Sequence, residues 1–239
     1  MNLVKQIPNA ITSMNLLCGA VGVILAFEGR PDAAFVAMIA GMVFDFCDGL
    51  AARALGAYSV IGKELDSLAD VVTFGVLPAL LLHTTMKACG ILSFWCYVPL
   101  VIAVFSALRL AKFNVDERQH DSFIGLATPS SAMICGSLCH FMAVNPSSGL
   151  SAFCTVPYVL PVLSIVLSML LVSEIPMISF KFGKGTEADG KTKVMRITML
   201  ALVLLCIIAA AVFGLKWSLA VLAVFVAYIV LNLVALAIR

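Results

Sequence analysis

The sequence predicts an all-α polytopic membrane protein with about eight transmembrane helices. Of its 239 residues, 62% are hydrophobic and 12% are charged, and the mean hydropathy is +1.11. A water-soluble protein of this size has too little interior to remove so much apolar surface from water. The lysines and arginines are also unevenly distributed between the apolar segments. These observations favour a chain that crosses a membrane repeatedly.

Eight apolar segments have roughly the length needed to cross a bilayer, which takes about 20 helical residues. The first has no small-residue cleavage site, so we interpret it as a retained helix rather than a signal peptide. The segments are residues 8–27, 33–53, 66–86, 91–110, 126–145, 152–173, 195–214 and 217–238.

The basic residues predict the orientation of these segments. With both termini in the cytoplasm, twelve of the fifteen lysines and arginines fall on the cytoplasmic side, and only Arg30, Lys87 and Lys216 fall outside. Cytoplasmic loops carry such an excess of basic residues. We therefore expect an integral protein of the cell (cytoplasmic) membrane, with both termini and the connection between the second and third segments on the cytoplasmic face.

One polar stretch divides the chain. Residues 174–194 are rich in Gly and Lys and are predicted to form a cytoplasmic loop. Residues 1–173 contain six segments, and residues 195–239 contain a final pair that is almost free of ionisable groups. We expect a six-helix core that carries the chemistry, followed by a C-terminal transmembrane helix pair.

Four aspartates lie at the inner ends of the second and third segments. Asp45 and Asp48 are three residues apart, and Asp66 and Asp70 are four apart, so each pair shares one helix face. Glycines in the connection ALGAYSVIGKE let the chain reverse, which places the two pairs opposite each other. Acidic groups in membrane segments are costly, about 2.5–3.5 kcal/mol at a helix centre, and they usually mark function.

Four converging carboxylates repel one another unless cations lie between them. Hard divalent ions prefer oxygen ligands, and Mg²⁺ or Mn²⁺ suits a site where a phosphate supplies further oxygens. Gly49 and Gly62 would let a ligand approach the backbone closely, and Arg53 would suit a phosphoryl oxygen. The pattern therefore favours a metal–phosphate site over an ion pathway.

The residues from Asp45 to Asp70 fit the pattern D-x2-D-G-x2-A-R-x8-G-x3-D-x3-D. This pattern resembles the signature of the CDP-alcohol phosphatidyltransferase family. The resemblance implies a dimeric membrane enzyme with a six-helix core and two divalent metal ions, Mg²⁺ or Mn²⁺. Such enzymes move a phosphatidyl group from a CDP-linked lipid to a small alcohol and release CMP.

The resemblance also implies roles for individual residues. One of the aspartates, Asp70, would be the general base as well as a metal ligand. The implied metal ligands are Asp45, Asp48, Asp66 and Asp70. The stretch PNAITSMN at residues 8–15 is similar to the family's first segment, which approaches the nucleotide. The residues implied to bind the nucleotide and its diphosphate are Asn9, Thr12, Gly49, Arg53 and Gly62.

Three further stretches resemble the phosphatidylserine synthase branch of that family. They are ALRLAKFN (107–114), FIGLATPSSA (123–132) and LLVSEIPMISFK (170–181). This similarity implies CDP-diacylglycerol and L-serine as substrates. The carboxylate of an amino acid needs a cation, and Arg109 and Lys112 lie three residues apart at the inner end of the fourth segment. We expect these two residues, with Asn114, to bind the acceptor.

Other functions remain open at this point. Glycerol 3-phosphate or an inositol phosphate would be alternative acceptors for the same reaction, and either would favour additional basic residues near the site. A cation-coupled transporter would use the aspartates as ion ligands, but it leaves Gly49, Arg53 and Gly62 unexplained. A purely structural membrane subunit leaves all four carboxylates without a role. No feature of the sequence points to a nucleic acid.

Overall fold

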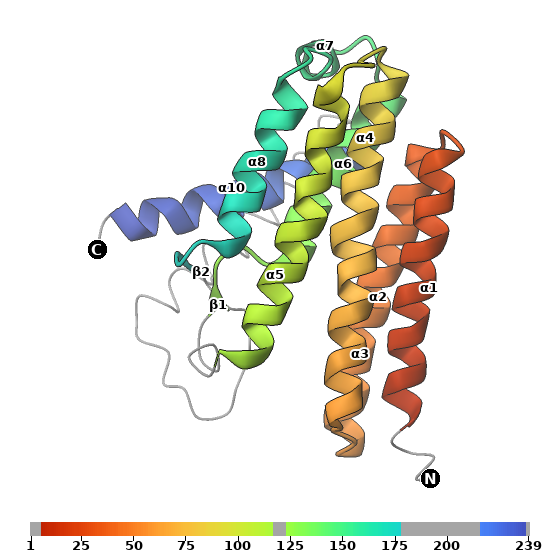
Figure 1. The fold of residues 1–239 in the computed structure, drawn as a ribbon, viewed down its shortest axis with the longest axis vertical. Helices are drawn as coiled ribbons and strands as arrows, with labels where there is room; N and C mark the ends of the chain where they lie inside the picture. The colour runs from red at the N-terminus through yellow and green to blue at the C-terminus, as the bar shows by residue number, and fades with distance from the viewer. Residues whose placement is uncertain (1–5, 117–122, 178–215, 238–239) are drawn as a thin grey trace.

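The computed structural model describes residues 6–116, 123–177 and 216–237. Within these ranges the protein is an elongated bundle of helices with one pair of two-residue strands (Figure 1). The predicted all-α membrane class is confirmed. Among the described residues, five helical runs are long and apolar enough to cross a membrane, namely Gln6–Phe27, Pro31–Leu55, Val60–Ala88, Phe94–Val115 and Trp217–Leu236.

The first two helices, α1 (Gln6–Phe27) and α2 (Pro31–Leu55), form an antiparallel pair. The turn between them contains Gly29 at φ 72°, a conformation that glycine adopts without steric cost. A proline, Pro31, begins α2, where its missing N–H is not needed. Both helices lie close to their predicted bounds.

The third run consists of α3 (Val60–Asp70), the π-helical segment η2 (Val71–Val76) and α4 (Leu77–Ala88). It begins six residues before the predicted segment, because Ser59 caps α3 by accepting a 2.9 Å hydrogen bond from the Gly62 N–H. The π turn follows Asp70 directly. A π turn takes in an extra residue, and such turns are frequent at functional sites.

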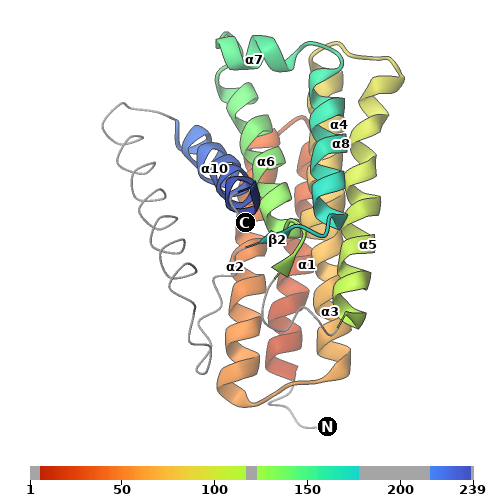
Figure 2. The same cartoon turned by 90° about the vertical axis from the view of Figure 1, so that its left-hand side faces the viewer.

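The fourth run begins as a 3₁₀ helix, η3 (Phe94–Leu100), and continues as α5 (Val101–Val115). After it, α6 (Thr128–Val144) passes through the bundle with fourteen of its seventeen residues buried. The two views agree that α6 lies among the other helices (Figures 1 and 2). This helix is therefore surrounded by protein rather than by lipid.

A short helix, α7 (Gly149–Cys154), leads into α8 (Val159–Val172). With 14 residues, α8 is shorter than a typical span and shorter than the predicted segment 152–173. At its lower end the strand β2 (Pro176–Met177) pairs antiparallel with β1 (Phe123–Ile124).

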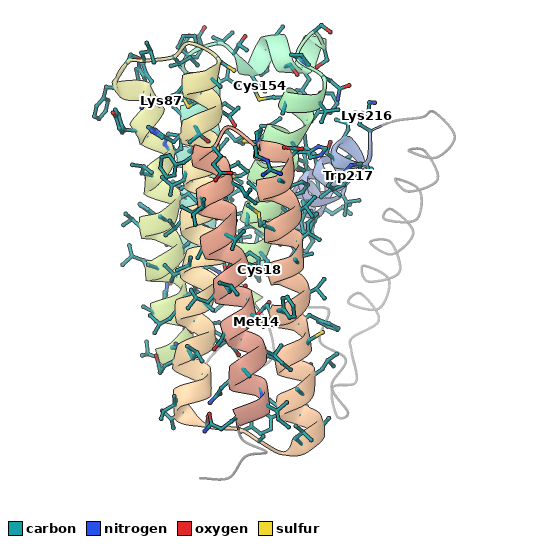
Figure 3. All side chains as sticks on the ribbon, turned by 90° about the vertical axis from the view of Figure 1, so that its right-hand side faces the viewer. Met14, Cys18, Lys87, Cys154, Lys216 and Trp217 are labelled. Carbon is teal, nitrogen blue, oxygen red and sulfur yellow. The ribbon has the colours of Figure 1, made fainter. Side chains whose placement is uncertain are left out.

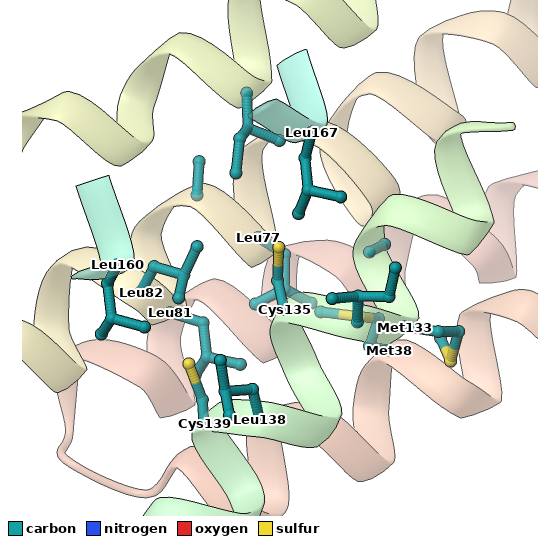
Figure 4. Close-up of a cluster of buried hydrophobic side chains, with 14 of the residues drawn as sticks. Met38, Leu77, Leu81, Leu82, Met133, Cys135, Leu138, Cys139, Leu160 and Leu167 are labelled. Atoms are coloured by element: carbon teal, nitrogen blue, oxygen red, sulfur yellow. The ribbon is translucent and has the colours of Figure 1, made fainter. Parts of the chain in front are cut away.

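The hydrophobic core lies where α2, α4, α6 and α8 meet (Figure 4). Its side chains are almost wholly removed from solvent, and a glycine on α6, Gly136, lets Phe35 of α2 pack against the helix backbone. The core side chains labelled in the figure are Met38, Leu77, Leu81, Leu82, Met133, Cys135, Leu138, Cys139, Leu160 and Leu167.

The final helix, α10 (Trp217–Ala237), forms at the predicted residues, but it runs across the bundle rather than along it (Figures 1 and 2). Its first residue stacks on Phe35 of α2, with ring centroids 5.3 Å apart. Figure 3 shows Lys87, Lys216 and Trp217 toward the same end of the molecule. The predicted segment 195–214 and most of the loop 174–194 lie outside the described residues.

Candidate active site

The hairpin between α2 and α3 brings three acidic side chains together. Asp45 and Asp48 come from α2 and Asp66 comes from α3, and one carboxylate oxygen of each lies within 4.8 Å of the others. In the part of the chain that the structure describes, this is the one group of three or more His, Cys, Asp or Glu side chains close enough to hold a metal ion.

The hairpin follows from two local signals. Gly56 ends α2 at φ 58°, and its N–H bonds to the carbonyls of Ala52 and Arg53. Helices often end with a residue in the left-handed conformation, and that residue is usually glycine. Three residues later, the side chain of Ser59 caps the N-terminus of α3. The predicted chain reversal between the two acidic pairs is therefore present.

The surroundings of the three carboxylates fit a hard divalent cation. Asp48 is 7% exposed and accepts a 2.5 Å hydrogen bond from the Thr12 hydroxyl. The Oδ1 atom of Asp66 is buried and has no hydrogen-bond partner. A buried polar atom without a partner costs about 1–3 kcal/mol, and more when it is charged. Since the donors are all carboxylate oxygens, an ion such as Mg²⁺ or Mn²⁺ suits the group.

Asp70 lies outside this group of three. It is 8% exposed, and its Oδ1 atom accepts a 3.1 Å hydrogen bond from Asn15 Nδ2 on α1. The charges of Asp45, Asp48 and Asp66 all act on it, so it is an electrostatic neighbour of the group. The structure thus gathers three of the four predicted ligands, and the role of Asp70 stays a prediction.

The residues predicted to bind the nucleotide lie on both sides of the hairpin. Arg53 folds back over Gly49, because a Cβ placed on that glycine would lie 3.8 and 3.9 Å from the two terminal guanidinium nitrogens. A Cβ on Gly62 would lie 2.9 Å from both Asn9 Oδ1 and Ser59 Oγ, closer than real side chains approach. A side chain at position 62 would therefore displace the side chains of Asn9 and Ser59, which lie against this glycine.

The three residues predicted to bind an acceptor have different partners in the structure. Arg109 is 7% exposed, its Nη1 atom lies 3.4 Å from Thr128 Oγ1, and its Nε atom is buried without a partner. Its guanidinium also lies 5.9 Å from the ring centre of Phe113, and it interacts electrostatically with Asp70. Arg109 is thus a buried cation, close enough to Asp70 for their charges to interact.

Lys112 does not join Arg109. Its Nζ atom lies 3.6 Å from Glu174 Oε1 in a partly exposed ion pair. Asn114 donates a 2.9 Å hydrogen bond to Ser67 on α3, and its carbonyl accepts one of 2.9 Å from Lys63. These two residues tie the end of α5 to its neighbours, and the acceptor-binding role of Arg109, Lys112 and Asn114 stays a prediction.

Four polar residues near the site were not predicted. Three of them, Asn15, Thr73 and Thr128, are polar side chains within apolar segments, and this feature could have identified them from the sequence. Asn15 also follows Thr12 by one helical turn, which would place both on the same face of the helix. Tyr228 on α10 gives no such signal, yet it is 7% exposed and interacts electrostatically with Arg109. The four residues are Asn15, Thr73, Thr128 and Tyr228.

A pocket of about 300 Å³ lies at the opposite end of the bundle. It is mainly apolar and is lined by residues of the α1–α2 turn and of α4, α6 and α7, with no acidic side chain among them. Nearby, His140 packs against the ring of Trp217 at a centroid distance of 4.5 Å. This end therefore contains none of the predicted site residues.

Comparison with known proteins identifies the family. Residues 5–170 match the family model for CDP-alcohol phosphatidyltransferase. The chain is 38% identical over 133 residues to the CDP-diacylglycerol--serine O-phosphatidyltransferase of Bacillus subtilis (strain 168), covering 54% of this chain and 72% of that protein.

Other relatives are matched over less of their own length. The chain is 36% identical over 181 residues to the protein of the same name from Mycobacterium bovis, covering 72% of this chain and 60% of that protein. It is 32% identical over 133 residues to an archaetidylserine synthase of Methanothermobacter thermautotrophicus, covering 55% of this chain and 56% of that protein. The chain belongs to the CDP-alcohol phosphatidyltransferase family.

Proposed function

We propose that this protein transfers the phosphatidyl group of CDP-diacylglycerol to the hydroxyl of L-serine, giving phosphatidylserine and CMP. The observation that carries the proposal is the convergence of Asp45, Asp48 and Asp66 within the family's signature. The names of the Bacillus and Mycobacterium relatives support serine as the acceptor.

Asp45, Asp48, Asp66 and Asp70 would hold two divalent ions, Mg²⁺ or Mn²⁺. Such ions neutralise a diphosphate and stabilise the negative charge that develops on the departing CMP. The unpartnered Oδ1 atom of Asp66 supports this assignment, because a buried carboxylate oxygen is costly without a partner and a bound cation would supply one.

The nucleotide and its diphosphate would bind beside the hairpin. Gly49 and Gly62 carry no side chain of their own, so a diphosphate could approach the backbone once the side chains beside them move, and the guanidinium of Arg53 over Gly49 would donate hydrogen bonds to phosphoryl oxygens. Asn9 lies directly beside Gly62, which places α1 next to the same region. Thr12 would act through Asp48, whose carboxylate it already holds.

The reaction would be a direct displacement at phosphorus. Asp70 takes the proton of the serine hydroxyl as general base. The serine oxygen then bonds to the phosphorus that carries the diacylglycerol, and the bond from that phosphorus to the CMP oxygen breaks, with its electron pair leaving on CMP. The described residues around the carboxylates include no Cys–His or Ser–His pair that would form a covalent intermediate.

Arg109 would bind the carboxylate of serine. Its guanidinium is buried and has an Nε donor without a partner, and its charge interacts with that of Asp70. A buried donor of this kind gains most from a charged acceptor. We give Lys112 and Asn114 a positioning role at the end of α5, since both are already bonded to neighbouring residues.

We further propose that the protein is a homodimer in the cytoplasmic membrane, with residues 1–173 as its catalytic unit and the site at the cytoplasmic face. The inner excess of Lys and Arg supports this orientation. The site also lies toward the N-terminal end of α1, near the predicted inner surface (Figure 1).

A CMP-release assay on the purified protein in lipid nanodiscs tests the reaction. CDP-diacylglycerol is supplied with L-serine, glycerol 3-phosphate or an inositol phosphate, each with Mg²⁺, with Mn²⁺ or with a chelator. We expect CMP only with serine and only with a metal. CMP release with glycerol 3-phosphate but not with serine would contradict the acceptor assignment. Cation flux in sealed vesicles without any CMP release would favour a transporter instead.

The variant Asp66→Asn tests the metal site in the same assay. Metal ions contribute several kcal/mol at such centres, and each 1.4 kcal/mol is a factor of ten, so we expect a loss of about a thousandfold. Asp32→Asn is the matched control, because Asp32 is exposed at the opposite end of α2. It should keep wild-type activity; equal losses in both variants would contradict the site.

A further inference from the structure

Asn15 occupies an unusual position for an amide in an apolar helix. It lies in the third turn of α1 and is fully buried. Its Nδ2 atom donates the 3.1 Å hydrogen bond to Asp70 Oδ1, 55 residues away in the chain. The amide nitrogen must face this carboxylate, because the reverse orientation would bring two acceptors together.

The backbone of Asn15 is held as well as its side chain. The Thr73 hydroxyl, in the π turn that follows Asp70, donates a 3.0 Å hydrogen bond to the Asn15 carbonyl. One bond therefore joins α1 to Asp70, the last residue of α3, and the other joins α1 to Thr73 in η2. Asn15 is therefore fixed to the residue it contacts and to the turn that follows that residue.

Close packing leaves this amide little room to move. A Cβ on Gly41 of α2 would lie 3.0 Å from Asn15 Oδ1, and a Cβ on Gly19 of α1 would overlap the Thr73 side chain. Such contacts are tighter than ordinary side chains allow, so both positions require glycine at this backbone spacing. The amide lies where α1, α2 and the third run pack closely together.

The remaining polar atom of Asn15 argues against a purely structural role. Its Oδ1 atom is buried and has no hydrogen-bond partner. An amide retained only for stability would be expected to satisfy both ends, since buried polar groups are nearly always paired. Here only the end that faces Asp70 is satisfied.

We propose that Asn15 is a positioning residue for Asp70, and this inference rests on the proposed function. Its amide fixes Oδ1 of that carboxylate and so leaves the other oxygen to serve the cation or the acceptor hydroxyl. Thr73 and the π turn hold the amide in place. Groups that orient a ligand in this way typically change metal affinity or activity by about 10- to 100-fold when removed.

Mn²⁺ binding, measured by electron paramagnetic resonance without nucleotide or lipid substrate, tests the proposal independently of turnover. Asn15→Leu removes the donor at similar volume, and Thr73→Val removes the hydroxyl that holds it. We expect the Kd for Mn²⁺ to rise about 10- to 100-fold in Asn15→Leu and by less in Thr73→Val. Thermal unfolding should be measured for each variant.

Thr85→Val is the matched control. Thr85 is a buried threonine on the same helical run but near the other end, where it lines the pocket. Its substitution should leave the Kd for Mn²⁺ unchanged. An unchanged Kd in a folded Asn15→Leu protein would overturn the proposal. If that variant does not fold, a folded Thr73→Val protein with wild-type Mn²⁺ affinity would overturn it as well.

The test separates this inference from the proposed reaction. Wild-type protein that binds Mn²⁺ but releases no CMP would contradict the proposed function while a weakened Asn15→Leu site still supported the positioning role. A wild-type protein that releases CMP but binds no Mn²⁺ without substrate would overturn the positioning role and leave the proposed function in place.

Discussion

The two ends of the bundle use their polar side chains in different ways. At the carboxylate end, hydrogen bonds join helices that are far apart in the chain. Thr12 bonds to Asp48 across 36 positions, and Asn15 bonds to Asp70 across 55. Asn114 bonds to Ser67 across 47 positions at the same end.

At the opposite end the bonds are more local. The Ser151 hydroxyl donates to the Asn145 carbonyl six residues away, at 2.6 Å, and the Ser148 hydroxyl donates to Ser151 at 2.9 Å. The ring of His83 lies 2.6 Å from the carbonyl of Cys96, thirteen positions along the chain. These contacts close loops between consecutive helices.

The difference separates two tasks. Local bonds fix the shape of turns, and they contribute mainly to stability. Long-range bonds fix the position of one helix relative to another, and here each of them involves a carboxylate or a neighbour of one. Substitutions at the carboxylate end should therefore reduce activity more than stability, and those at the opposite end should do the reverse.

The largest expected effect comes from Asp70→Asn. A general base typically contributes about 10²- to 10⁴-fold to the rate, so CMP release should fall by about that factor. The amide nearly matches the carboxylate in size, and the thermal unfolding temperature should change little. If the variant keeps more than a tenth of the wild-type rate, Asp70 is not the general base. Such a result would also contradict the expectation that substitutions at the carboxylate end reduce activity most.

Arg109→Lys should have an intermediate effect on the acceptor. A lysine keeps the charge but loses the planar fork that binds a carboxylate through two hydrogen bonds. Charged hydrogen bonds contribute about 1.5–3 kcal/mol, so the KM for serine should rise about 10- to 100-fold. The KM for CDP-diacylglycerol should change much less.

Lys112→Ala provides the contrast on the same helix. Its partly exposed ion pair with Glu174 contributes little energy, about 0–1 kcal/mol. The KM for serine should therefore stay near the wild-type value. If Lys112→Ala raises this KM as much as Arg109→Lys does, the two cations act together and the assignment of the acceptor to Arg109 alone is wrong.

The smallest effect on activity should come from Ser151→Ala at the opposite end. The hydroxyl is buried and bonds to the Asn145 carbonyl, so its loss should cost about 0.5–1.5 kcal/mol of stability. Thermal unfolding would show this cost, while both KM values and the rate should stay at wild-type levels. A loss of activity without a loss of stability would break the distinction between the ends.

Much of the first half of the chain could be predicted from the sequence. Apolar length located α1 and α2, and the glycines of the connection indicated where the chain reverses. Spacing on a helix then placed each acidic pair on one face. These features depend on local geometry, which a sequence pattern records directly.

The remaining features depend on contacts between distant elements. The π turn at Val71–Val76 changes which direction the side chains after Asp70 face around the helix axis. The sequence VVTFGV contains no residue that predicts such a turn. Arg109 and Lys112 have a spacing that predicts a shared face, but the first is buried in the bundle and the second reaches Glu174 near β2. The packing of α10 also involves residues far away in the sequence, such as Phe35, on which Trp217 stacks.

The burial of α6 has a consequence for biogenesis. A segment that leaves the translocon alone inserts into the bilayer according to its own hydrophobicity. The helix α6 is poorly suited to this, because it contains a threonine, three serines and a histidine within seventeen residues. Once assembled, those groups face other helices instead of acyl chains. Stable insertion of α6 should therefore depend on the earlier helices already being in place, which makes the order of synthesis part of how this enzyme acquires its structure.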